Sequence, residues 1–332
     1  MLRRGLVREK RKKKLATYLR TNPPGLRIYA FYSTMLAAFS SAFALGSLPP
    51  LRSMSDAGIL YSPYNWKISA GGSATTINPG AYFKTIYSGQ SVVLHANTTA
   101  LVAMGSQFWT RTDRGPLIQH VLTAGETDAT FNISAGPPFS ASPKHIIEVI
   151  IKSTTETENR WDSNVASTAV VFTGIELDAI GAAAPLELPR RKPFNVLIYG
   201  DSITEGVRTM GFVDIANDTD RNDAVRDYSF HLSQLLPIEI GVVAFGATGT
   251  TKGGSGGVPD LTKSWNQLWD GEPRDFTTHT PNLVVRLKYV SNVFDSIATS
   301  YSYITVARYE YQTYYLFLSM TYIVVLYEVL IL

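Results

Sequence analysis

Residues 195–206 place a glycine, an acid and a serine directly after an apolar run: Asn-Val-Leu-Ile-Tyr-Gly-Asp-Ser-Ile-Thr-Glu-Gly. The apolar run predicts a β-strand, and the residues after it predict the start of a helix. A serine at such a sharp junction exposes its hydroxyl beside unpaired helix amides that could bind an oxyanion. The pattern therefore indicates that Ser202 could act as a nucleophile.

The same residues also fit an interpretation without chemistry. Ser202 and Glu205 have the S-x-x-E spacing of a capping box, which any strand-to-helix loop could use to satisfy its first amides. Both interpretations stay open on the spacing alone. A phosphate-binding loop is excluded, because Lys252 is not preceded by glycine in the G-x-x-x-x-G-K order.

The string GDSITEG at 200–206 resembles the first sequence block of the SGNH, or GDSL-type, hydrolases. In that family the serine of this block attacks an ester carbonyl. The resemblance implies that Ser202 is the nucleophile and that its N–H is one oxyanion donor. It implies that Asp201 supports the loop, and that no metal or organic cofactor is needed.

The stretch VVAFGATGT at 242–250 follows a second predicted strand, at the distance where the family has its second block. The family uses a glycine N–H of this block in the oxyanion hole. Gly249 is the expected donor, with Gly246 as the second choice. The alternative is a flexible loop, since four more glycines follow at 253, 254, 256 and 257.

Two other elements of the family pattern are absent. After the strand predicted at 282–285 the chain continues as Arg-Leu-Lys-Tyr-Val-Ser-Asn-Val, without the family's Gly-x-Asn-Asp. The Asp-x-x-His that supplies the family's general base is also missing. A serine hydroxyl is a weak nucleophile until a base removes its proton, and none of the five histidines stands where the family has its base. The catalytic base is therefore unknown, and we expect impaired catalysis.

The composition changes from Arg286 onward. Nine of the eighteen tyrosines fall between Tyr289 and Tyr327, and glycine and histidine are absent there. Our hypothesis is that residues 286–332 are an aberrant tail, read from an unspliced intron or a changed frame, which truncates a hydrolase domain at 194–285. The apolar stretch from Tyr314 to Leu332 could alternatively span a membrane.

The chain has 332 residues, enough for two domains, and a formal net charge of +3. That charge is concentrated at the start, where residues 1–27 hold ten Lys and Arg and one acid, so the remainder is acidic. A nucleic-acid partner is therefore not expected. Since cysteine is absent, disulfides and metal–thiolate sites are excluded.

Residues 1–49 read as a basic tail followed by a targeting segment. Ile28 to Leu48 carries no charge, and Ala42-Phe43-Ala44 resembles a cleavage site, so the segment predicts a signal peptide or an uncleaved membrane anchor. Either places the domains outside the cytoplasm, as secreted or membrane-anchored protein. Glycosylation sequons at Asn97, Asn132 and Asn217 agree with such a route.

Between the ends the pattern predicts two domains. Short strands separated by turns at 56–180 indicate a β-sandwich, whose strand order resembles the jelly-roll domain that precedes the SGNH domain in carbohydrate esterase family two. Residues 181–193 read as a linker. Strands at 195–199, 238–245 and 282–285 with helices between them predict an α/β/α domain with a parallel sheet.

Together these features predict a serine esterase that acts on carboxylic (acetyl) esters, with a small-molecule or polysaccharide ester as its partner. Two alternatives remain. The chain could be a carbohydrate-binding or cell-surface protein without catalysis, or a membrane-tethered protein with apolar ends.

Overall fold

The computed structural model describes residues 50–102, 105–134, 144–162, 167–178, 181, 184–211, 217–290, 301–307 and 313–319. The predicted targeting segment within residues 1–49 lies outside these ranges, and so does much of the predicted tail. Signal-peptide cleavage and membrane anchoring therefore stay predictions.

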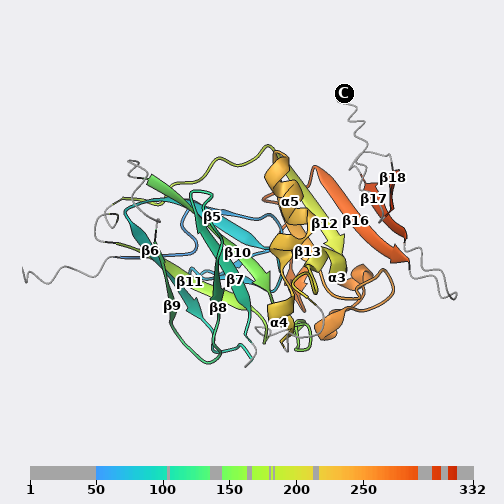
Figure 1. The fold of residues 1–332 in the computed structure, drawn as a ribbon, viewed down its shortest axis with the longest axis horizontal. Coiled ribbons are helices and arrows are strands. Elements are labelled where there is room, and N and C mark those ends of the chain that lie inside the picture. Colours follow the sequence, from blue (N-terminus) through green and yellow to red (C-terminus); the bar gives the residue numbers. More distant parts are fainter. Residues whose placement is uncertain are drawn as a thin grey trace, which may run out of the picture. The chain divides into compact units, whose positions relative to one another are not determined.

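The N-terminal half of the described chain forms two antiparallel sheets (Figure 1). One sheet has the order β3 (Lys67–Ile68), β4 (Ala74–Thr76), β11 (Val170–Leu177), β6 (Ser91–Asn97) and β9 (Ala129–Ser134), with β1 (Leu51–Arg52) also on β11. The other has the order β2 (Ile59–Tyr61), β5 (Tyr82–Ser88), β10 (Lys144–Ser153), β7 (Gln107–Thr112) and β8 (Ile118–Val121).

The two sheets share one hydrophobic core. Side chains along β5 and β6 alternate between more and less buried positions, as expected for strands with one face on a core. Phe83 of β5 and Phe172 of β11 meet edge to face with ring centroids 5.4 Å apart, and Phe108 of β7 meets Phe172 at the same distance. The described residues between 51 and 177 thus form a β-sandwich, as the sequence predicts, while its domain bounds and jelly-roll connectivity stay predictions.

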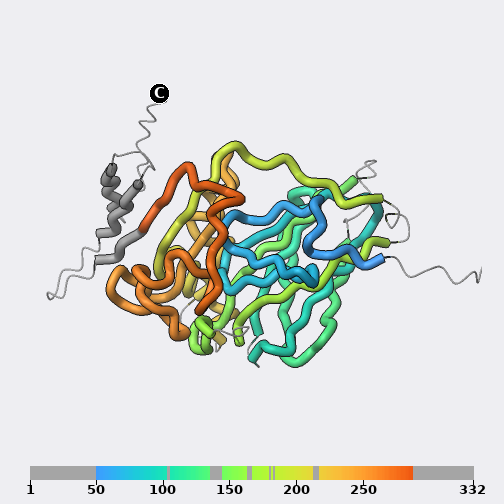
Figure 2. Tube along the Cα trace, turned by 180° about the vertical axis from the view of Figure 1, so that it is seen from behind, coloured from blue at the N-terminus to red at the C-terminus, as the bar shows by residue number. Residues whose placement is uncertain are grey.

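The C-terminal half is built on a third sheet of mixed direction (Figures 1 and 2). Strands β13 (Ile238–Ala244), β12 (Phe194–Gly200) and β16 (Leu283–Val290) are parallel, with Tyr199 opposite both Val243 and Arg286. The carboxyl ends of these three strands therefore meet at one edge. In doubly wound sheets this is the edge where ligands bind.

The helices beside the third sheet are short. They are α3 (Ser202–Glu205), α4 (Asp218–Arg221), α5 (Tyr228–Leu235) and α6 (Leu261–Ser264), with 3₁₀ turns η1 (Ala224–Arg226) and η2 (Ser255–Gly257) and a hairpin of β14 (Gln267–Trp269) and β15 (Glu272–Pro273). The predicted parallel strands are present, whereas a full three-layer α/β/α domain and its truncation stay predictions. None of these described helices is long and apolar enough to span a membrane.

A portion of the predicted tail continues the third sheet. Strand β16 runs past Val285 to Val290, and β17 (Tyr301–Ala307) and β18 (Thr313–Ser319) follow it as antiparallel strands. The first residues of the possible membrane span therefore lie in a β-strand. That residues 286–332 come from an altered reading of the gene is a statement about the transcript, and it stays a hypothesis.

The predicted linker and the start of the third sheet are packed against the sandwich. Glu187 pairs with Ile86 of β5, and Leu186 is buried in the core of the sandwich. Asn65 donates to the Val242 carbonyl (2.6 Å) and accepts from the Val242 N–H (3.1 Å). Because Asn65 is fully buried, these two bonds satisfy the Val242 N–H and carbonyl, which face away from β12.

Candidate active site

Helix α3 begins directly at the carboxyl end of β12. The side chain of Asp201 caps it by accepting from the Ile203 N–H (3.0 Å), and Gly206 ends it in a left-handed conformation (φ 79°). The turn is tight, since a Cβ on Gly200 would lie 2.0 Å from Thr204 Oγ1. The sequence thus positions a one-turn helix with a glycine before it and another after it.

The capping-box interpretation of Ser202 and Glu205 is wrong. The cap residue is Asp201, and the Glu205 carboxylate accepts instead from the Gly246 N–H (2.7 Å). Ser202 is half-buried as the first residue of α3, and no other described residue makes a hydrogen bond to its hydroxyl or its N–H. The predicted nucleophile is therefore not used as a structural cap.

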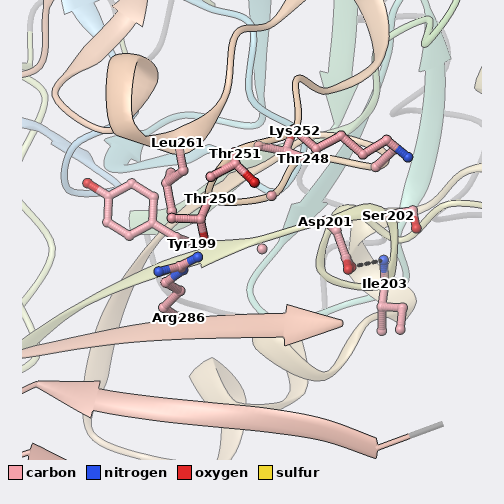
Figure 3. A pocket seen from close by; sticks show the side chains of 13 residues that line it. Tyr199, Asp201, Ser202, Ile203, Thr248, Thr250, Thr251, Lys252, Leu261 and Arg286 are labelled. Atoms are coloured by element: carbon pink, nitrogen blue, oxygen red, sulfur yellow. Dashed lines mark hydrogen bonds between the residues drawn. The ribbon is translucent and has the colours of Figure 1, made fainter. Parts of the chain in front are cut away.

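Ser202 lines a cavity of about 870 Å³ at the carboxyl edge of the third sheet (Figure 3). The lining comes from residues 199–203 at the end of β12, residues 247–252 after β13, Leu261 of α6 and Arg286 of β16. In Figure 3, Asp201 and Ser202 lie toward one end, and Arg286 lies with Tyr199 and Leu261 toward the other. The cavity thus collects residues from the end of β12, from the loop after β13 and from β16, where Arg286 is the last residue paired in parallel with β12.

The predicted oxyanion glycines differ in their surroundings. Gly249 lines the cavity with Ser202, but its N–H donates to the Lys252 carbonyl (2.8 Å). Gly246 does not line the cavity, and its N–H is bonded to Glu205. Either amide would have to leave its present acceptor before it could hold an oxyanion.

Ala247 is a residue that sequence reasoning missed. It lines the cavity with φ of 64°, a conformation uncommon for alanine, and no other described residue accepts from its N–H. Its amide and that of Ser202 are thus both without an acceptor among the described residues. Nothing in the sequence around Ala247 signals this strain.

No histidine reaches the cavity, although all five lie in the described ranges. The rings of His95, His120 and His145 bond to Asp128, Thr110 and Asp113 of the sandwich. His231 is exposed on α5, and His279 is half-buried, with its pKa lowered chiefly by burial. The ionisable groups of the lining are Asp201, Lys252, Arg286 and Tyr199, and the Asp201 carboxylate already accepts from Ile203.

Arg286 was not predicted to contribute to the site. It stands opposite Tyr199 in the parallel register, half-buried, at the first position of the predicted tail. Sequence reasoning ended the hydrolase domain at Val285, and so omitted this cation. Among the described residues no group of three or more His, Asp and Glu side chains could hold a metal.

A buried acid lies behind the nucleophile helix. Glu205 is 1% exposed and forms an ion pair with Arg160, whose Nη1 lies 2.6 Å from Glu205 Oε1. Burial raises the pKa of Glu205, which Arg160 partly offsets, to about 7. The sequence suggested only a capping-box role for Glu205 and none for Arg160, because Arg160 lies 45 positions before Glu205.

Comparison with known proteins gives matches at the level of structure only. No family model matches the chain, and no curated protein matches it by sequence. Among solved structures, a family two carbohydrate esterase from Cellvibrio japonicus aligns with TM-score 0.57 and 18% identity over 71% of this chain and 66% of that one. An acetyl xylan esterase from Butyrivibrio proteoclasticus aligns with TM-score 0.56 and 14% identity over 72% and 64%.

A third structure, a family two carbohydrate esterase from Clostridium thermocellum in complex with cellohexaose, aligns with TM-score 0.54 and 19% identity, over 69% of this chain and 65% of that one. At such low identity these matches show a shared fold. The chain spans slightly less than two thirds of the length of these structures. This chain thus shares its fold with these three solved structures.

Proposed function

We propose that this protein is a serine esterase of the SGNH type that cleaves acetyl esters, with a carbohydrate as the alcohol component. One observation carries the proposal: Ser202, with no bond to its hydroxyl from other described residues, lines a cavity at the carboxyl ends of parallel strands. The fold shared with carbohydrate esterases supports the same chemistry.

The reaction would proceed in two steps. Ser202 Oγ attacks the acetyl carbonyl carbon and loses its proton to solvent water. The sugar oxygen takes a proton from water as the alcohol leaves and the acetyl–enzyme ester forms. Water then attacks that ester, acetate leaves, and the proton returns to Oγ. The oxyanion formed in each step would accept from the Ser202 N–H and from an amide of the 246–250 loop, with Gly249 the donor that the family resemblance favours.

Missing catalytic groups lower the expected rate. No histidine lines the cavity, and the Gly-x-Asn-Asp asparagine is absent, so general base catalysis and one oxyanion donor are lacking. One oxyanion donor is worth about 10²–10³ in rate, and loss of the base leaves about 10³–10⁴ over water. We therefore propose that this chain turns over slowly, although its serine can still be acylated.

The test compares wild type, Ser202→Ala and the control Ser233→Ala, a buried serine of α5 that lies outside the cavity. We expect slow hydrolysis of an aryl acetate by wild type and Ser233→Ala but not by Ser202→Ala. Intact-mass analysis after treatment with an alkyl fluorophosphonate should give a single adduct that needs Ser202. Adduct formation or hydrolysis that survives Ser202→Ala would refute the role of this serine.

A second function is favoured by the lack of a histidine in the cavity lining. The chain could bind carbohydrate without cleaving it, as a cell-surface or secreted module. The Clostridium thermocellum structure with a similar fold is a complex with cellohexaose, which makes that sugar a reasonable probe. Calorimetric binding of cellohexaose by Ser202→Ala, together with no Ser202-dependent hydrolysis by wild type, would favour this alternative.

Secretion also belongs to the proposal and rests on the uncharged segment Ile28 to Leu48 alone. Expression of the full chain in a eukaryotic secretory host separates the possibilities. A cleaved protein in the medium is expected, whereas material that resists carbonate extraction from membranes would indicate an anchor.

A further inference from the structure

One carboxylate joins the two segments that border the candidate nucleophile. Glu205 ends helix α3, three residues after Ser202, and its Oε2 accepts from the N–H of Gly246 (2.7 Å). Gly246 starts the loop that carries Ala247 and Gly249 into the cavity. This side chain therefore links helix α3, which begins with Ser202, to the loop at 246–252, which we call the oxyanion loop.

The other oxygen of Glu205 is held by a residue of the sandwich. Arg160 lies in the connection between β10 and β11, and its Nη1 is 2.6 Å from Glu205 Oε1. The side chains of both residues are at most 1% exposed. Since this connection joins two strands of the sandwich, the ion pair links the sandwich strands to the segment that carries Ser202.

Hydrogen bonds within its own connection also hold the Arg160 side chain in place. Its Nε donates to the Thr155 carbonyl (2.6 Å) and its Nη2 to the Thr154 carbonyl (2.7 Å), both in its own connection. Its guanidinium also lies 5.9 Å from the centre of the Phe245 ring, and Phe245 directly precedes Gly246. Arg160 thus contacts both the acid and the loop that the acid holds.

The close packing of this region leaves little room for another arrangement. A Cβ on Gly256 would lie 2.7 Å from Arg160 Cγ, and one on Gly246 would lie 3.0 Å from Ser255 Oγ. A buried ion pair is weak evidence for stability, because an apolar pair of similar size often stabilises as well or better. A role in holding a defined geometry explains such a pair more directly.

We propose that Arg160 and Glu205 are positioning residues, through which the sandwich holds the oxyanion loop at a fixed distance from Ser202. The sandwich then belongs to the catalytic apparatus and is not a separable binding module. The catalytic consequence of this inference rests on the proposed esterase function. The contacts of Glu205 with Arg160 and with the Gly246 N–H, which we call the clamp, are a property of the folded chain.

The charges around Glu205 predict how the clamp responds to pH. Burial raises the pKa of Glu205, Arg160 lowers it, Glu156 raises it, and the Gly246 N–H lowers it, to about 7 in all. Glu156 is itself bonded to Asn222 (2.6 Å). Above pH 7 the Gly246 N–H therefore donates to a carboxylate, which is a stronger acceptor than the protonated acid.

The sequence offers a direct probe of this hydrogen bond. Phenylalanine is followed by glycine only once in the chain, at 245–246. Full-length protein labelled with carbonyl-¹³C phenylalanine and ¹⁵N glycine thus gives one carbonyl-filtered amide signal, that of Gly246. We expect its proton shift to titrate once, with a midpoint near pH 7.

The variants give distinct outcomes. Glu205→Gln should abolish the titration, and Arg160→Met should move its midpoint upward by at least one pH unit. Arg160→Lys keeps the positive charge, so its midpoint should lie between those of wild type and Arg160→Met. Arg274→Met is the matched control, because Arg274 is also buried and donates to a carbonyl of the sandwich region, that of Tyr64, without touching Glu205.

Three results would overturn the proposal: a Gly246 proton shift that is unchanged in Glu205→Gln, a titration that persists in Glu205→Gln, or the same midpoint in wild type and a folded Arg160→Met. If Arg160→Met does not fold, the proposal is judged by the loss of the titration in Glu205→Gln and by the change of midpoint in Arg160→Lys. An equal change of the midpoint in Arg274→Met would also contradict the clamp, since loss of any buried arginine would then have the same effect on Gly246.

A kinetic measurement tests the catalytic consequence separately. For Ser202-dependent hydrolysis of an aryl acetate, we expect Arg160→Met to lower kcat tenfold or more with KM changed less than twofold, and Arg160→Lys to recover some of the lost kcat. If wild type shows no Ser202-dependent reaction while Gly246 titrates as expected, the esterase proposal fails and the clamp stands. If kcat is unchanged in Arg160→Met, the positioning role is refuted.

Discussion

At the scale of single residues, the site is determined by contacts that short motifs do not contain. Asp201, Ser202 and Gly249 follow from GDSITEG and its partner block. Glu205 looked like a helix cap, yet it bonds to Gly246 and Arg160. The identity of its partners depends on chain segments 41 and 45 residues away, so no local pattern could have shown them.

The raised pKa of Glu205 predicts a pH-dependent stability. The ordinary value of 4.5 becomes about 7 in the folded protein, so the folded state holds the proton more tightly. Stability from this group is then full below about pH 4.5 and is lost as the pH rises to about 7. One pKa unit corresponds to about 1.4 kcal/mol, so the shift of about 2.5 units limits the loss to about 3.5 kcal/mol.

Urea unfolding of Glu205→Gln between pH 5 and 8 checks this expectation. The variant should lose less stability than wild type over that range, even if its overall stability is lower because Arg160 is left unpaired. Burial also raises the pKa of Asp227 to about 7, so this group adds its own loss of stability as the pH rises. The slope of stability against pH in Glu205→Gln should therefore be smaller than in wild type but not zero. A slope equal to that of wild type would contradict the raised pKa.

The glycine that ends helix α3 predicts a local packing effect. Gly206 has φ of 79°, and an added Cβ would lie 2.4 Å from the Asp223 carbonyl oxygen. Gly271 has a similar φ of 74° with nothing within 4 Å of an added Cβ. Gly271→Ala should therefore cost only the backbone term of about 1 kcal/mol, and Gly206→Ala about 2–4 kcal/mol in the free energy of unfolding.

Chemical denaturation of the two variants measures the difference between them, which isolates the steric contact from the backbone strain that both share. Equal losses would mean that the turn after α3 relaxes around the added methyl group. That would weaken the view that the nucleophile helix is held rigidly.

At the scale of elements, a strand, a cap and a one-turn helix present Ser202. The strand comes from the apolar run and the turn from Gly200, both readable in sequence. The capping box predicted Ser202 as the cap, whereas in the structure Asp201 is the cap, because its carboxylate accepts from the Ile203 N–H. This choice leaves the serine hydroxyl available at the cavity.

Removal of the cap should disturb both stability and the site. We expect Asp201→Ala to lower the free energy of unfolding by about 1 kcal/mol, and Asp201→Asn to lose less, because asparagine also caps helices well. Asp260 caps α6 by the same kind of bond, to the Thr262 N–H (3.1 Å), and Asp260→Ala is the control.

The distinguishing readout is the rate at which a fluorophosphonate labels Ser202. It should fall in Asp201→Ala and stay near the wild-type rate in Asp260→Ala. Equal labelling of all three proteins would show that α3 holds its position without the cap.

At the scale of the whole molecule, the sandwich and the third sheet are joined by buried polar contacts. Lys152 of β10 donates to the carbonyls of Thr219 (2.6 Å) and Asn222 (2.8 Å), and Asn65 pairs with the Val242 backbone. Such contacts favour one fixed arrangement, because each broken bond leaves a buried group unsatisfied. The predicted separation into independent domains stays a prediction, and these contacts argue for mutual dependence.

Asn65 tests that dependence. Asn65→Ala removes both bonds to Val242 in a fully buried place, so we expect a loss of about 2–4 kcal/mol in the free energy of unfolding. The Asn282 side chain likewise accepts from a strand amide, the Asn195 N–H (2.8 Å), but it is exposed. Asn282→Ala should therefore cost under about 1 kcal/mol.

Thermal unfolding followed by near-ultraviolet circular dichroism shows whether the sandwich and the third sheet still melt together. A second, earlier transition in Asn65→Ala would indicate that the third sheet unfolds before the sandwich. A loss as small as that of Asn282→Ala would contradict a structural role for the buried bonds.

The sequence by itself determined the strands and the place of the candidate nucleophile. Alternation of apolar residues specified the sandwich strands, and an apolar run followed by Gly-Asp-Ser specified the turn at Ser202, because these signals are local. Tertiary structure decided which amides are occupied, why no histidine reaches the cavity, and that Arg160 meets Glu205. It also decided that some of the segment after Arg286 extends the sheet. These outcomes depend on long-range packing and on the burial of charge, which neighbouring residues along a chain do not encode.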